Sequence, residues 1–118
     1  MDASPIFVKT YDLLKWLLPH TIQFPKSQRF VMAKRLEDAA LGFYDAILRS
    51  AKRTGHGPEA LKEADIELEK LRLYLRLAQD LKLLSFKQYE HASRLVSEIG
   101  KLLGAWIRKT GEGRPSPV

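Results

Sequence analysis

The spacing of apolar and basic residues in the last third of this 118-residue chain constrains its fold most strongly. Apolar side chains recur there at intervals of three and four residues, at Tyr89, Ala92, Val96, Ile99, Leu103 and Trp106. This spacing places them on one side of a helix as a buried seam. Cations recur about every two helical turns, at Lys87, Arg94, Lys101 and Arg108. Lys87 points about 160° away from Tyr89, so the pattern predicts one long helix with a basic outer face.

Three earlier stretches also have helical spacing, and turn-forming residues separate them. Pro19 and Pro25 mark the break after the first helix, and the Gly/Pro run at 55–58 marks the break after the second. A capping box of Ser85 and Gln88 marks the start of the last helix. We therefore predict helices over 6–18, 28–53, 58–82 and 86–109, with no strand. In the first helix we expect this seam: Phe7, Tyr11, Leu14 and Leu18.

Short breaks between long helices place consecutive helices side by side. The sequence therefore predicts an all-α, antiparallel up-down-up-down four-helix bundle. We expect it to form one domain over residues 1–110, followed by a disordered Gly/Pro tail at 111–118.

The third predicted helix has more apolar surface than a lone amphipathic helix requires. Its main seam is Leu61, Ala64, Leu68, Leu71, Leu75 and Ala78. Other sides carry Ile66, Leu73, Tyr74, Leu77 and Leu81. Either this helix lies deep in the bundle, or a second face meets another subunit. We predict an oligomer interface at Leu73, Tyr74, Leu77 and Leu81.

The net charge of +6 results from 20 Lys and Arg residues against 14 Asp and Glu residues. Such an excess favours an anionic partner, although it also serves solubility. There is no cysteine, which excludes disulfides and fits a reducing compartment. The first ten residues lack the features of a signal peptide, and no apolar run is long enough to span a membrane. We expect a soluble cytoplasmic protein.

The residues that support catalysis or metal binding are missing from the sequence. A di-iron bundle needs Glu-x-x-His pairs, and no Glu stands three residues before His20, His56 or His91. There is no phosphate-binding loop, no nucleophile elbow and no Ser/His/Asp set. The sequence predicts no enzyme, no catalytic residue, no metal and no cofactor. A metal-dependent or otherwise catalytic bundle is the least favoured hypothesis, and metal analysis would reveal it.

The basic excess is concentrated on the second and fourth predicted helices. The third also carries Arg72 and Arg76, for which two interpretations stand. They could form ion pairs with Glu69 and Asp80, at spacings of three and four residues. Alternatively, their guanidinium groups could bind phosphate or a partner's carboxylates.

Four segments taken together resemble a known family, the accessory variability proteins of diversity-generating retroelements. These segments are Phe24–Phe30, Leu68–Ala78, Leu84–Glu90 and Ile99–Trp106. Their order and spacing carry the resemblance, which covers residues 5 to 109. Related four-helix-bundle proteins are encoded in intervening sequences of ribosomal RNA genes.

The resemblance implies a non-catalytic four-helix bundle that assembles as a ring-shaped homopentamer. Such proteins bind the retroelement's reverse transcriptase and nucleic acid, and they support mutagenic copying of a template RNA into cDNA. Basic residues of the matching motifs are Lys26, Arg29, Arg72, Arg76, Lys87 and Lys101. With Arg94 and Arg108, they are the predicted binding residues for reverse transcriptase, RNA, cDNA or hybrid. The alternative is an intervening-sequence-type bundle that binds ribosomal RNA or another protein.

Overall fold

The computed structural model describes residues 4–52 and 57–112 of the chain. These residues form four α-helices: α1 (Pro5–Thr21), α2 (Lys34–Lys52), α3 (Gly57–Asp80) and α4 (Phe86–Glu112). A short 3-10 helix (η1, Lys26–Gln28) and a π-helical segment (η2, Arg29–Ala33) precede α2. No strand occurs within these two ranges, which confirms the all-α, four-helix prediction.

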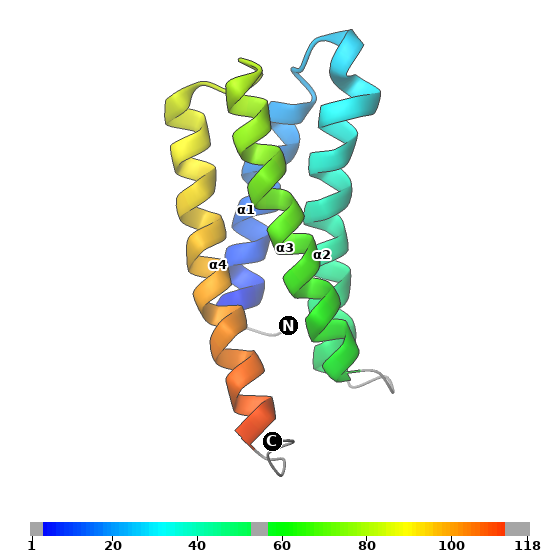
Figure 1. Ribbon diagram of the computed structural model, residues 1–118, viewed down its shortest axis with the longest axis vertical. Coiled ribbons are helices and arrows are strands. Elements are labelled where there is room, and N and C mark those ends of the chain that lie inside the picture. Colours follow the sequence, from blue (N-terminus) through cyan, green and yellow to red (C-terminus); the bar gives the residue numbers. More distant parts are fainter. Residues whose placement is uncertain (1–3, 53–56, 113–118) are drawn as a thin grey trace.

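The four helices lie side by side along the long axis of the molecule (Figure 1). The connection between α1 and α2 and the connection between α3 and α4 lie at the same end, the top of Figure 1. Each helix contacts the next one in the chain, and α4 also packs against α1. This arrangement surrounds one core and leaves one long face of every helix exposed.

The core contains the seams predicted for the last two helices, together with one apolar face of α2. Fully buried side chains include Leu36, Phe43, Ile47, Leu68, Leu71, Leu75, Val96, Ile99 and Leu103. Tyr89 and Trp106, at the two ends of the predicted α4 seam, are only partly buried. Removal of these apolar side chains from water is the main stabilising contribution.

The predicted seam of the first helix was wrong by one residue in phase. The buried side chains of α1 are Ile6, Thr10, Leu13, Leu17 and Thr21. The predicted seam at Phe7, Tyr11, Leu14 and Leu18 is half-buried or exposed. The buried Thr10 is compatible with this core because its hydroxyl donates to the Ile6 carbonyl oxygen at 2.6 Å.

Several predicted helix boundaries also differ from the structure. Helix α1 continues through Pro19 to Thr21, because a proline near the last turn removes only one intrahelical hydrogen bond. Regular α2 begins at Lys34 instead of residue 28, since η1 and η2 come first. Helix α4 continues to Glu112, past the predicted end at 109. Residue 53, the proposed Gly55 end signal and residues 113–118 of the predicted tail lie outside the described residues.

The connection between α3 and α4 is held by hydrogen bonds at both helix ends. Lys82 has a left-handed φ of 63°, and the Leu83 amide donates to the Ala78 carbonyl at 2.8 Å. This pattern is a Schellman motif. The predicted capping box is confirmed, because the Gln88 amide donates to Ser85 Oγ at 3.1 Å and the Ser85 amide to Gln88 Oε1 at 2.9 Å.

Candidate functional site

The outer face of α4 carries a row of exposed cations, here called the α4 stripe: Lys87, Arg94, Lys101 and Arg108. Among the described side chains, those of residues 4–52 and 57–110, none of the four forms an ion pair. The prediction that these side chains point away from the core agrees with their exposure. Because no carboxylate pairs with them, their charge is available to an anionic partner.

One acidic residue, Glu98, lies beside the stripe and is bound by another helix. Lys9 of α1 places its Nζ 2.6 Å from Glu98 Oε2. This hydrogen bond and the Lys9 charge hold the pKa of Glu98 below its ordinary value, and the charges of Lys101 and Arg94 lower it further. The same contact raises the pKa of Lys9. Lys9 therefore shares the carboxylate with the stripe and reduces its capacity to neutralise the stripe.

The two arginines of α3 have different surroundings. Arg72 donates from Nη1 to Glu69 Oε1 at 2.9 Å, as one sequence interpretation predicted. Its guanidinium also lies against Gly100 of α4, where a Cβ would be only 2.5 Å from Nη2. Arg76 is exposed, and the predicted pair with Asp80 is absent between these two described residues. Arg72 is thus engaged at the α3–α4 contact, whereas Arg76 is available to a partner.

Lys26 and Arg29 lie on η1 and at the start of η2, and both are exposed. They are at the connection end of the bundle, away from the middle of the α4 stripe (Figure 1). The eight predicted basic residues therefore do not form one patch. They divide into the stripe, the two α3 arginines and a pair beside the α1–α2 connection.

Helix α3 also presents an exposed apolar ridge, formed by Ile66, Leu73 and Leu77 and extended by Leu81, which directly follows the helix. Leu73 keeps 61% of its surface exposed, so this ridge does not belong to the single-chain core. Tyr74, also predicted at the interface, is half-buried beside it. The sequence allowed either that this helix lies deep in the bundle or that its second face meets another subunit. The exposure of the ridge excludes the first of these.

An apolar groove of about 470 Å³ lies between α1 and α2. Its walls are Phe7, Tyr11, Leu14, Leu41, Tyr44 and Leu48, and Lys52 lies at its edge. The Phe7 and Tyr44 rings meet edge to face, with centroids 6.3 Å apart. Sequence reasoning missed this groove because it assigned its α1 wall to the core. A second apolar series, Ile6, Leu13 and Leu17, lies one residue before the predicted seam and was the sequence signal for the correct buried face.

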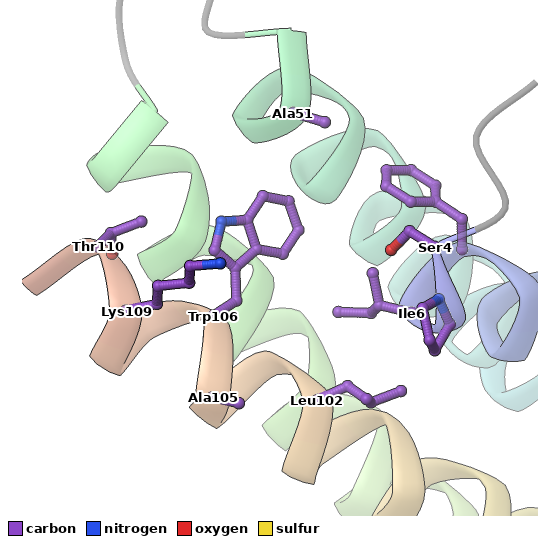
Figure 2. A pocket seen from close by; sticks show the side chains of 10 residues that line it. Ser4, Ile6, Ala51, Leu102, Ala105, Trp106, Lys109 and Thr110 are labelled. Atoms are coloured by element: carbon purple, nitrogen blue, oxygen red, sulfur yellow. The ribbon is translucent and has the colours of Figure 1, made fainter.

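A second cavity, of about 600 Å³, lies where the end of α4 passes the start of α1. Figure 2 shows the Trp106 indole and the Lys109 side chain on α4, with Ile6 and Ser4 across the cavity and Ala51 at its far side. Its lining is mainly apolar, with Lys109 as the only ionisable side chain. Such a lining offers shape and one positive charge, but no acid–base pair for catalysis.

The described residues contain neither a metal-binding cluster nor a membrane-spanning helix. No group of three or more His, Asp or Glu side chains there could hold a metal ion. No described helix has both the length and the apolarity needed to cross a membrane.

These features define a class of small helical-bundle proteins with exposed basic and apolar faces. Within this class, the chain belongs to the bAvd-like family, whose model matches residues 6–110. The resemblance found in the sequence is thereby confirmed.

The chain is also similar in fold to a protein of unknown function from the S23 ribosomal protein family of Bacteroides thetaiotaomicron. The TM-score is 0.65 at 22% sequence identity, covering 85% of this chain and 89% of that one. At this identity the similarity concerns the fold alone. No curated protein matches the chain.

Proposed function

We propose that this chain is a non-catalytic accessory protein of a diversity-generating retroelement. It binds the reverse transcriptase and the template RNA or its cDNA through basic surfaces, and it supports mutagenic cDNA synthesis. Membership of the bAvd-like family supports this role. We further propose an antiparallel up-down bundle that acts in the cytoplasm as a ring-shaped homo-oligomer, a pentamer by family resemblance.

The observation that carries the nucleic-acid part of the proposal is the unpaired α4 stripe. From Lys87 to Arg108 the helix rises about 32 Å, which matches about nine steps of a nucleic-acid strand at 3.4 Å per step. Cations spaced along one rigid rod contact the phosphate backbone without reading bases. This mode suits a protein that must accompany a polymerase along a changing template sequence.

The assembly part of the proposal pairs the α3 ridge of one subunit with the α1–α2 groove of the next. Ile66 to Leu77 on α3 and the groove wall from Leu41 to Lys52 on α2 each span about 17 Å of helix, so ridge and groove have similar lengths. Helix α3 carries six acidic and four basic residues, and Lys52 lies at the groove edge. Because the two surfaces differ, repeated pairing is head-to-tail and not two-fold, and it forms a closed ring when the rotation between neighbouring subunits closes. A ring also repeats each basic surface, which strengthens weak phosphate contacts through effective concentration.

The test replaces the two central stripe cations with glutamate, as Arg94→Glu and Lys101→Glu together. RNA affinity is measured over a range of salt concentrations. Each lost phosphate contact should reduce the slope of log affinity against log salt by about 0.7 to 0.9, so the double variant should lose about 1.4 to 1.8.

The matched control is Lys15→Glu with Lys62→Glu, which changes net charge equally on exposed residues of α1 and α3. The control should retain most of the slope. If the stripe variant and the unmodified chain have equal slopes of log affinity against log salt, the α4 stripe does not bind phosphate.

The fold similarity to an S23-family protein keeps a second candidate function open, that of a bundle binding ribosomal RNA or another protein. The genomic neighbourhood separates the two. A reverse transcriptase gene with a template repeat supports the retroelement, whereas a ribosomal RNA operon supports the alternative.

A further inference from the structure

The α1–α2 and α3–α4 connections lie at one end of the bundle (Figure 1). Four large apolar side chains on these connections or directly beside them are exposed. They are Ile22, Phe30, Val31 and Phe86. Phe30 keeps 80% of its surface exposed and Phe86 keeps 62%. Burial of an aromatic side chain against a partner would gain more than burial of any other residue type at this end. We call these four residues, with the cations described next, the connection-end surface.

Four cations accompany these apolar side chains: Lys26, Arg29, Lys82 and Lys87. All four are exposed and lack an ion pair within the residues that the structure describes. Asp80, at the end of α3, is the acidic residue closest to them in sequence. The end therefore combines apolar side chains with a net positive border.

The exposed side chains lie on connections whose backbone is held in place by buried residues and hydrogen bonds. Phe24 in the first connection and Leu84 in the second are buried in the core. The second connection is also closed by the Schellman hydrogen bonds and the capping box. Phe30 and Val31 lie on the π-helical segment η2, and π-helical turns occur frequently at functional sites. Lys82 adopts a left-handed backbone conformation where glycine is usual.

The chemistry of this surface fits a protein better than a nucleic acid. Phe30 and Phe86 are rings on which bases could stack, but the aliphatic Ile22 and Val31 beside them offer no ring for a base and are buried favourably only against an apolar partner surface. A second copy meeting end to end would bring four cations against four cations, which like-charge repulsion opposes. A protein patch of apolar side chains bordered by carboxylates satisfies both components.

We propose that the connection-end surface is the docking site for the reverse transcriptase, with Phe30 and Phe86 as its two anchors. This inference rests on the proposed function and assigns the polymerase to the bundle end and the nucleic acid to the side of α4. Lys26, Arg29 and Lys82 then contact carboxylates of the polymerase at the end face. Lys87 begins the α4 stripe, which remains for phosphate along its full length.

The test measures two affinities of the double variant Phe30→Ser with Phe86→Ser. One is for the nuclease-treated reverse transcriptase of the same retroelement, and the other is for its template RNA. Reverse-transcriptase affinity should fall tenfold or more, as expected for two aromatic anchors, while RNA affinity stays within twofold. A second variant, Phe30→Leu with Phe86→Leu, should recover most of the affinity because it keeps apolar volume.

The control is Val8→Ser with Ile107→Ser, two exposed apolar side chains outside the connection-end surface, which should leave both affinities unchanged. Full reverse-transcriptase affinity of the Phe30 and Phe86 serine variant overturns the docking site while leaving the proposed function intact. Failure of the unmodified chain to bind the polymerase overturns both. Loss of RNA affinity in place of polymerase affinity, or binding to phosphatidylserine vesicles that the serine variant abolishes, assigns the surface to another partner and overturns the inference.

Discussion

Lys82→Gly should stabilise the fold, because Lys82 holds a backbone conformation that glycine adopts without strain. Its φ of 63° lies in the left-handed region, where a side chain with a Cβ costs roughly 1 to 2 kcal/mol. Glycine loses more entropy on folding, by roughly 0.5 to 1 kcal/mol. The difference predicts a net gain of about 0.5 to 1 kcal/mol, with the Lys82 and Leu83 amide hydrogen bonds retained.

The assay is reversible urea unfolding followed by circular dichroism, at one fixed protein concentration because association adds to apparent stability. The matched control is Lys62→Gly, at an exposed position inside α3. There, glycine should cost about 1 kcal/mol because the backbone is helical. The same substitution should therefore change stability in opposite directions at the two sites.

The Lys82→Gly variant also separates stability from binding. If Lys82 contributes its charge to the connection-end surface, the variant is more stable yet binds the reverse transcriptase less tightly. A free energy of unfolding that is unchanged or lower in Lys82→Gly, with Lys62→Gly destabilised as expected, would refute the strained-turn reasoning.

Two further predictions concern assembly and pH. Leu73→Glu with Leu77→Glu should reduce the molar mass in light scattering to that of a monomer, because a charge in the ridge opposes burial by a partner. Ile107→Glu, with 38% exposure against 39% for Leu77, should leave the mass unchanged, and an unchanged mass in both variants would exclude the ridge as an interface. Lys9→Gln should raise the pKa of Glu98 in an NMR titration, because the Lys9 hydrogen bond is the main cause of its lowered value. Since the folded pKa of Glu98 lies below its unfolded value, the stability from this pair is present above the unfolded pKa and is lost as pH falls through the folded pKa; an unchanged Glu98 pKa in the variant would contradict that cause.

The last two helices were the most predictable from sequence. Each has one dominant apolar seam, so a single phase accounts for burial, as at Leu68 and Ile99. The Ser85–Gln88 capping box was also predictable, since it depends only on local spacing. Helix α1 was less predictable because two apolar series overlap, and tertiary packing selected the one containing Thr10. The π-helical segment at Arg29–Ala33 has no recognised sequence signal of its own.

The candidate site was predictable where it depends on one helix and was missed where it depends on several. The α4 stripe is a property of heptad spacing, and its four cations are exposed as predicted. The α1–α2 groove needs the relative rotation of two helices, which composition and spacing leave undetermined. The connection-end surface brings Phe30 and Phe86 to one end of the bundle from separate connections, so only the three-dimensional arrangement reveals it.

The most direct test of the central proposal is co-purification of this chain with the reverse transcriptase of its retroelement, with and without nuclease treatment. An adaptor that contacts both polymerase and nucleic acid should retain the polymerase after nuclease treatment, and should retain template RNA when nuclease is omitted. If the chain is folded and oligomeric but recovers neither polymerase nor template RNA, the result contradicts the proposal.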